Sequence, residues 1–245
     1  MNTSTFARPL RSPFSLAATS LAVALFMALA SGCTSLLPKP PPQPAFYSLD
    51  AASVPRPAPP REIRAMRAML PTVIVNPPRA AAGFDSQRII YTRQPHRLEY
   101  FAHSEWADTP ARMLAPLIVA ALDATPAFGA VVTTASAASG DLRLDTEIVR
   151  LQQDFSTQPS RVRFTLRAVM FDNATRRVLA WREFDETVAA GSDDPPGGVL
   201  AAHRAVQAVL GPLANFCAEA AGGWVSDQRL QPAPNAAAAT RSSPR

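Results

Sequence analysis

The sequence predicts an α+β domain in which a mostly antiparallel sheet packs against two main helices. Apolar residues alternate with arginine and threonine over residues 161–170, as in a strand with one buried face. Turn-forming residues at 172–175 and a second strand from 177 to about 188 complete a hairpin. Apolar residues also recur three or four apart over 113–122 and over 199–220, which indicates two amphipathic helices.

The N-terminus has the form of a secretory signal. A basic start and a mostly apolar run over residues 14–30 lead into Ala30-Ser31-Gly32-Cys33. This run is shorter than the roughly 20 apolar residues of a spanning helix, which favours a cleaved signal peptide at 1–32. Small residues before a cysteine resemble a bacterial lipobox, although Ala30 stands where leucine is usual. We predict diacylglycerol and N-acyl lipid on Cys33 and no other cofactor; the alternative is ordinary secretion.

Composition limits the partners. Removal of residues 1–32 leaves 213 of the 245 residues and lowers the formal charge from +5 to +3, because two arginines and no acids are lost. This charge is mild, and no basic cluster interleaved with aromatic residues is present. We therefore expect no nucleic-acid partner. Lipidation of Cys33 would leave Cys217 without an intramolecular partner. Cys217 is then either a small buried core residue, which its apolar helical surroundings favour, or half of an intermolecular disulfide.

Two segments flank the expected domain. Residues 33–60 are rich in proline and are predicted to form a lipidated tether, because proline-rich chains extend by about 3.1 Å per residue. A short apolar stretch at 46–49 interrupts this tether. Residues 227–245, low in bulky apolar side chains, are predicted to be disordered. The folded domain is therefore expected over 61–226.

Several shorter strands precede the central hairpin. The segments with strand composition and flanking turn residues are 72–75, 88–92, 97–102, 130–132 and 142–151. The second and third are separated by Gln94-Pro95 and predict another hairpin. In the last segment the alternation changes phase at Val149, which predicts a β-bulge or a change of exposed face.

The helix boundaries follow from capping and proline signals. Asp108-Thr109-Pro110 provides an N-cap candidate with proline at the first helical position. Pro116 should then kink this helix, unless the regular helix begins there. The last helix is expected after a loop at 195–198, with a kink at Gly211-Pro212.

No motif for catalysis or metal binding is present. His96, His103 and His203 do not stand at metal-ligand spacing, and there is neither a Gly-x-Ser-x-Gly elbow nor a phosphate-binding glycine loop. The absence of these motifs predicts a protein that is not an enzyme and binds no metal. The alternative is a catalytic triad of Ser, His and Asp residues that are distant in the chain and meet only in the folded protein.

Four residues are candidates for binding. Arg161, Arg163 and Arg167 project from one face of the predicted strand, where guanidinium groups bind phosphate or acidic residues. The alternative is a solvated face in which these arginines pair across the hairpin with Glu183, Asp185 or Glu186. Trp106 is either a surface anchor for a partner protein or a core residue at the strand-to-helix turn.

The chain resembles the ABC-type transport auxiliary lipoprotein family over roughly residues 45 to 222. The features that carry this resemblance are the lipobox, the proline-rich spacer, Phe46-Tyr47-Ser48-Leu49, Val73-Ile74-Val75, Ile90-Tyr91, Leu98-Glu99-Tyr100, Trp106-Ala107-Asp108-Thr109-Pro110, Arg112-Met113-Leu114, Phe128, Asp141-Leu142-Arg143-Leu144 and the closing helix.

The resemblance implies a non-enzymatic lipoprotein in the inner leaflet of the outer membrane, facing the periplasm. Its implied partners are an MCE-domain protein and an ABC permease and ATPase, in a system that moves phospholipid or other lipid between two membranes. Thr34 after the cysteine agrees with sorting to the outer membrane. The resemblance also implies a homo-oligomer, because family members assemble into rings.

Two other functions compete with this adaptor hypothesis. One is a periplasmic lipid-binding carrier, which needs an internal apolar pocket large enough for acyl chains. The other is a periplasmic hydrolase, which needs a triad that the sequence does not locate.

Overall fold

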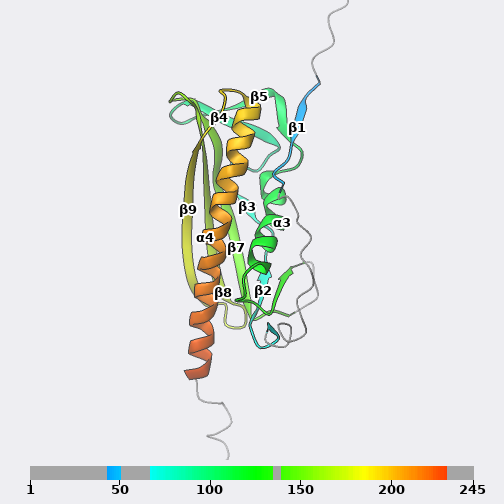
Figure 1. Cartoon of the computed structure of the whole chain (residues 1–245), viewed down its shortest axis with the longest axis vertical. Coiled ribbons are helices and arrows are strands. Elements are labelled where there is room, and N and C mark those ends of the chain that lie inside the picture. The colour runs from blue at the N-terminus through cyan, green and yellow to red at the C-terminus, as the bar shows by residue number, and fades with distance from the viewer. Residues whose placement is uncertain (1–42, 51–66, 135–138, 231–245) are drawn as a thin grey trace, which may run out of the picture. The chain divides into compact units, whose positions relative to one another are not determined.

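The computed structural model describes residues 43–50, 67–134 and 139–230. Within these residues one mixed sheet of nine strands is covered on one face by two helices, which lie side by side along the long axis (Figure 1). The strands are β1 Ala45–Tyr47, β2 Thr72–Val75, β3 Arg79–Ala80, β4 Arg88–Gln94, β5 Arg97–Trp106, β6 Ala130–Thr133, β7 Leu142–Asp154, β8 Arg161–Asp172 and β9 Val178–Ala189. The helices are α3 Pro110–Asp123 and α4 Pro195–Leu230. The predicted α+β fold class is confirmed.

The long strand β7 organises the sheet. Along one edge it pairs with β8, which continues antiparallel into β9. Along its other edge β2, β3 and β4 pair with it in succession, all parallel. β5 forms the predicted hairpin with β4, and β6 lies beside β2. The parallel pairs were not expected, because they join segments that are distant in sequence.

The predicted irregularity in β7 is present. The register between β7 and β8 shifts between Ile148 and Arg150, at the residue where the alternation of the sequence changes phase. Beyond the shift, Leu151 and Gln153 are the buried residues of β7, whereas Leu142, Leu144 and the other even positions are buried before it. The bulge therefore places Leu151 on the same helix-covered face as Leu142, Leu144 and Ile148.

The folded domain begins before the expected boundary at residue 61. β1 pairs in parallel with the end of β5, with Ala45 opposite Ser104 and Tyr47 opposite Trp106. Leu49 is 3% exposed and belongs to the core. The segment 46–49 therefore lies within the domain. At the other end α4 continues to Leu230, beyond the expected domain end at 226.

Helix α3 begins as its sequence predicts. Thr109 is the N-cap residue and Pro110 occupies the first helical position, where the missing N–H has no intrahelical partner. The helix then continues through Pro116 to Asp123. A helix start at Pro116, one of the two expected outcomes, is thereby excluded.

Helix α4 begins earlier than expected. Residues 195–198 were predicted to form a loop, but they are the first turn of the helix. Asp194 provides the cap, because its Oδ1 accepts a hydrogen bond of 2.8 Å from the Gly197 N–H. Pro195 follows at the first helical position, so Asp194-Pro195 repeats the signal that identified α3. The helix also continues through Gly211-Pro212.

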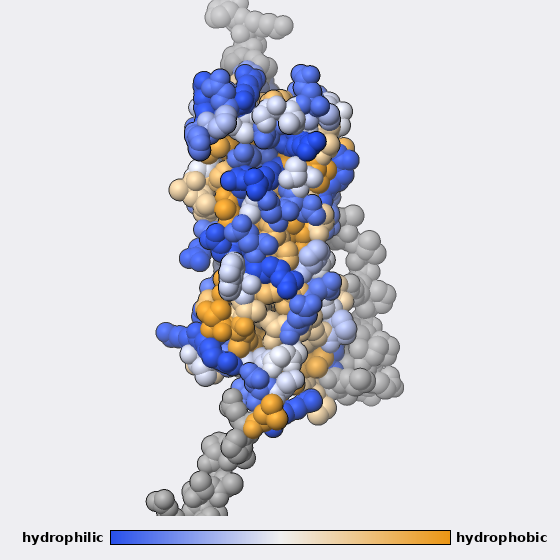
Figure 2. All heavy atoms as spheres, turned by 90° about the vertical axis from the view of Figure 1, so that its left-hand side faces the viewer, coloured by the Kyte–Doolittle hydropathy of each residue, from blue (hydrophilic) through white to orange (hydrophobic). Residues whose placement is uncertain are grey.

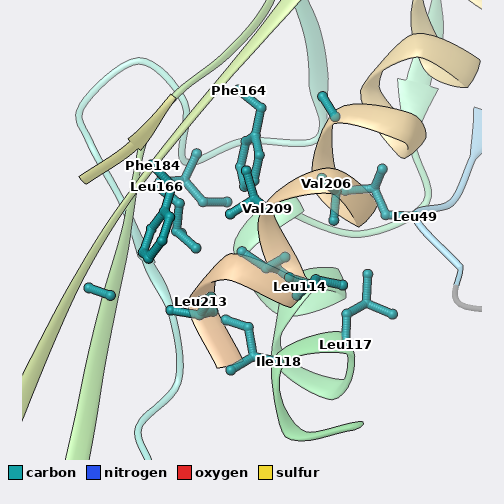
Figure 3. Close-up of a cluster of buried hydrophobic side chains, with 14 of the residues drawn as sticks. Leu49, Leu114, Leu117, Ile118, Phe164, Leu166, Phe184, Val206, Val209 and Leu213 are labelled. Atoms are coloured by element: carbon teal, nitrogen blue, oxygen red, sulfur yellow. The ribbon is translucent and has the colours of Figure 1, made fainter. Parts of the chain in front are cut away.

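The core lies between the helices and the sheet (Figure 3). α4 crosses β8 and β9, and α3 lies beside α4. The labelled core side chains come from the loop after β1, from both helices and from β8 and β9: Leu49, Leu114, Leu117, Ile118, Phe164, Leu166, Phe184, Val206, Val209 and Leu213. Burial of this shared apolar surface fixes both helices on one face and leaves the opposite face of the sheet uncovered in the described part of the chain.

Candidate interaction face

The uncovered face of β7, β8 and β9, here called the outer face, carries the predicted arginines. Even-numbered residues of β8 such as Phe164 and Leu166 are buried under the helices. Arg161, Arg163 and Arg167 are exposed on the opposite side. The structure thus places all three arginines on one face, as the alternation predicts.

Arg163 is held by an acidic residue across the hairpin. Its Nε lies 2.9 Å from Asp185 Oδ1, and its Nη2 contacts Oδ2 of the same carboxylate. Thr165 Oγ1 donates to Asp185 Oδ1 at 2.7 Å. The hydrogen bond from Arg163 lowers the pKa of Asp185, and the same bond raises the pKa of Arg163. This arginine is therefore engaged within the sheet.

Arg167 bridges two strands. Its Nη1 lies 3.1 Å from Glu147 Oε2 on β7, and its Nη2 lies 3.1 Å from Glu183 Oε2 on β9. Arg161 makes no ion pair with a described residue. Arg163 and Arg167 thus pair with acidic residues across the hairpin, which is the second of the two predicted roles, and their partners Asp185 and Glu183 are among the predicted ones. Glu147 was not anticipated, because its place beside β8 depends on the long-range pairing of β7.

The two tryptophans of the sheet have opposite environments. The Trp106 side chain is buried, with the residue 3% exposed, and its backbone N–H donates to the Gln87 carbonyl at 2.6 Å. Trp106 is therefore a core residue, the second of its two predicted roles, since a side chain this buried offers no surface to a partner. Trp181 is 67% exposed and stands opposite Val169 on the outer face. The sequence could have indicated an exposed Trp181, because the residue it pairs with, Val169, lies on the same side of β8 as the arginines.

Trp181 belongs to an apolar group on the outer face, here called the distal patch. Its members are Val169, Phe171, Val178 and Trp181, at the end of the sheet formed by the β8–β9 turn. Arg143 of β7 lies over the Phe171 ring, with its guanidinium carbon 4.5 Å from the ring centroid. Figure 2 shows the side on which β9 lies, where an apolar area interrupts polar residues in the lower half of the view.

A second exposed apolar group lies on β1 and β5, here called the proximal patch. It consists of Phe46, Leu98 and Tyr100, which are 63%, 48% and 52% exposed. The Arg88 guanidinium lies over the Tyr100 ring, 4.0 Å from its centroid. A groove of about 430 Å³ runs beside Leu98 and Tyr100 and is bordered by Gly83, Asp85 and Ser86.

A further groove adjoins the turn between β4 and β5. It has a volume of about 480 Å³ and a mixed lining that includes His96, Leu98, Arg150, Asp154 and Arg163. Arg163 is neutralised by Asp185, and the remaining Arg and Asp side chains of the lining are one of each, Arg150 and Asp154. The groove therefore has no excess of one charge that would select an ion.

The cavity between the sheet and α4 is small. The cavity lined by Ile89, Trp106, Leu151, Gln153 and Ala202, among others, has about 10 Å³. This volume admits about one water molecule and is far below that of an acyl chain.

The described residues hold no group of three or more His, Cys, Asp or Glu side chains that could ligate a metal ion. His96 lies in the β4–β5 turn, His103 on β5 and His203 on α4, so they come from separate elements. Cys217 is fully buried in α4, and burial raises the pKa of its thiol to about 12. This agrees with its expected role as a core residue.

The predicted lipidation site lies outside the described residues, since these begin at Gln43 and Cys33 precedes them. No helix among the described residues is long and apolar enough to cross a membrane.

The described residues thus form one α+β domain whose sheet carries exposed apolar groups and paired charges. The chain belongs to the family of ABC-type transport auxiliary lipoprotein components, whose model matches residues 47–214. As a member of this lipoprotein family, it is a membrane-anchored protein of the cell envelope. The family is not an enzyme family. The resemblance inferred from the sequence is confirmed.

Solved structures agree on the fold. The crystal structure of protein XCC0632 from Xanthomonas campestris is 23% identical, with a TM-score of 0.62 over 75% of this chain and 99% of that chain. A second crystal structure, of an uncharacterized protein, is 12% identical, with a TM-score of 0.55 over 72% of this chain and 99% of that one. The comparison with curated proteins gave no match.

Proposed function

We propose that this protein is the adaptor lipoprotein of an MCE/ABC-type intermembrane lipid transport system, attached to the inner leaflet of the outer membrane through lipid on Cys33. The observation that carries the proposal is the family match over residues 47–214. An adaptor acts by binding, so it requires no reactive group. The exposed aromatic and apolar residues of the outer face are suited to this role.

The position of β1 indicates how such an adaptor would be oriented. Only nine residues separate Cys33 from Gln43, so the tether would reach about 30 Å when extended. It joins the domain at the end where β1 lies, and the β8–β9 turn lies at the opposite end (Figure 1). The distal patch therefore lies at the end of the domain opposite β1, where it would face a partner in the periplasm.

Trp181 is the proposed anchor for the MCE-domain protein. Large exposed aromatic side chains provide much of the binding energy of protein interfaces. Val169 and Phe171 extend the apolar surface around it, and Arg143 adds a donor at its margin. Arg167, which pairs with Glu147 and Glu183, lies two residues along β8 from Val169 and borders this patch, where it favours one orientation of the partner.

The carrier hypothesis receives less support. A carrier must enclose at least one acyl chain, whereas the cavity between the sheet and α4 has about 10 Å³. Native mass spectrometry of the purified protein is expected to find no stoichiometric lipid beyond that on Cys33. A co-purified phospholipid would favour the carrier.

Photo-crosslinking in intact cells tests the docking. A photoreactive amino acid in place of Val178, which lies in the distal patch and leaves Trp181 intact, is expected to trap an MCE-domain protein. The same replacement of Leu200, which is 57% exposed on α4, provides the matched control and is expected to trap none. Failure at position 178, under conditions that trap a known pair of such proteins, would contradict the proposal.

Fractionation tests the anchor. The Cys33→Ser variant is expected to leave the outer membrane and appear in the soluble periplasmic fraction, because one lipid-bearing residue supplies the attachment. If Cys33→Ser remained in the membrane fraction, the proposed anchor would be wrong.

A further inference from the structure

We propose that the proximal patch is a membrane-docking surface, on which the folded domain rests against the headgroup region of the bilayer that anchors it. This inference rests on the proposed attachment through Cys33, and it adds an orientation that attachment alone does not supply. A proline-rich tether sets only the maximum height of the domain. The exposed side chains decide whether the domain stands away from the bilayer or lies on it.

The three side chains of the patch share one face of the sheet. Phe46 pairs in register with Glu105, and Arg88 of β4 pairs with the same residue from the other side. Paired residues in adjacent strands point to the same face. The Arg88 guanidinium lies over the Tyr100 ring, so Tyr100 belongs to that face as well. Leu98 is two residues from Tyr100 and lines the same groove.

The chemistry of the patch suits a membrane interface. Tyrosine and phenylalanine rings concentrate at the headgroup level, and arginine extends its charge from an apolar stem toward phosphate. Arg88 makes no ion pair with a described residue, although Asp85 and Glu105 lie in the same region. Leu98 and Phe46 supply the apolar surface that would enter the interface.

The position of the patch favours the bilayer over a protein partner. Phe46 is thirteen residues from Cys33, and β1 and β5 lie at the end of the domain that the tether joins (Figure 1). A short tether keeps the patch at an effective concentration of about millimolar near the surface. Insertion of these three apolar side chains into the interface is then sufficient to hold the domain on the bilayer. Without the tether, the same three side chains would bind the bilayer only weakly.

The test uses the full mature chain, coupled through Cys33 to a maleimide-bearing phospholipid in vesicles of phosphatidylethanolamine and phosphatidylglycerol. Cys217 is fully buried and does not compete for the maleimide. An environment-sensitive fluorescent amino acid replaces Leu98, and the same replacement of Leu200 is the control. Lipid-borne spin labels at the headgroup level are expected to quench the probe at 98 and to leave the probe at 200 unquenched.

Replacement of both Phe46 and Tyr100 by serine is expected to lower the docking equilibrium constant about tenfold, and so to reduce quenching at position 98. A double variant of the distal patch, Val178→Ser with Trp181→Ser, is the matched control and should leave quenching unchanged. Equal quenching at 98 and 200, no quenching at 98, or no effect of the proximal variant would overturn the inference. Because coupling is chemical, these results are independent of acylation in cells, which the Cys33→Ser fractionation reports separately.

Discussion

Asp172 shows how one buried carboxylate joins several elements. It ends β8, is 4% exposed, and accepts a hydrogen bond of 2.8 Å from Trp224 Nε1 near the end of α4. The Thr175 N–H in the β8–β9 turn donates to its other oxygen at 2.9 Å. This backbone hydrogen bond is the main cause of the lowered pKa of Asp172, with Trp224 contributing. The end of α4 is thereby fixed to the hairpin turn.

Asp172→Asn is expected to destabilise the protein by about 1–3 kcal/mol at neutral pH, because the asparagine NH₂ group faces an N–H donor. A lowered folded-state pKa stabilises the protein above the usual aspartate value of 3.8, and this contribution is lost as pH falls through the folded-state pKa. Urea denaturation at neutral pH and at about pH 3 should therefore show a smaller difference between the two proteins in acid.

Asp227→Asn is the control for this effect. The Asp227 side chain is 57% exposed and lies 3.5 Å from Arg177, so its replacement should cost less than about 1 kcal/mol at either pH. Equal effects of the two variants would contradict the role assigned to Asp172.

Cys217 gives a second prediction for a single residue. In the Cys33→Ser variant Cys217 is the remaining thiol of the chain, and its pKa of about 12 and full burial should prevent reaction with a thiol reagent near pH 8. Reaction should become rapid when urea unfolds the protein. Fast labelling of the native protein would show that the thiol is accessible.

At the scale of elements, α4 is the helix that its sequence describes least well. Glycines and prolines interrupt it at several positions, yet it runs unbroken over 36 residues. Small residues at its start permit close packing: a Cβ added at Gly198 would collide with the Gln153 side-chain amide. Gln153 is itself buried and donates from Nε2 to Ser160 Oγ at 2.8 Å. Packing against β7, β8 and β9 therefore compensates for weak helix propensity.

Gly198→Ala is expected to destabilise the protein by about 1–3 kcal/mol, because its Cβ must displace a packed and hydrogen-bonded side chain. Gly222 lies in the same helix with open space at the Cβ position, and Gly222→Ala should stabilise by about 0.5–1 kcal/mol. Thermal or urea denaturation measures both. A stabilising Gly198→Ala would show that α4 does not pack closely on Gln153.

At the scale of the whole molecule, β1 and Leu49 decide where the domain begins. The three-residue strand adds to the edge of β5, and the Ala107 N–H donates to the Tyr47 carbonyl at 2.6 Å. Leu49 then enters the core beside α3 and α4 (Figure 3). The tether thus ends at a strand held by the domain, at the end that carries the proximal patch.

Leu49→Ala is expected to destabilise the domain by about 2–4 kcal/mol, since it removes a buried side chain from the core. Phe46 lies three residues earlier and is 63% exposed, so Phe46→Ala should cost less than about 1 kcal/mol. Denaturant unfolding of the two variants provides the comparison. A negligible effect of Leu49→Ala would mean that the core is complete without the β1 segment.

The sequence by itself determined the features that depend on neighbouring residues. Alternation identified the β8–β9 hairpin, the arginine-bearing face and the phase change in β7, because side chains alternate between faces with a period of two. Capping signals located the start of α3. The resemblance, read from the order and spacing of its motifs, identified the family that the match over residues 47–214 confirms.

Only the tertiary structure decided the features that depend on distant residues. The parallel pairing of β2, β3 and β4 with β7 brings together strands whose contacts leave no local pattern. Trp106 and Trp181 are both aromatic residues near strand ends, but one is covered by the core and the other faces solvent. Burial depends on what the rest of the chain places against each face, so neighbouring residues determine local geometry and only the packed fold determines which surfaces remain free to bind.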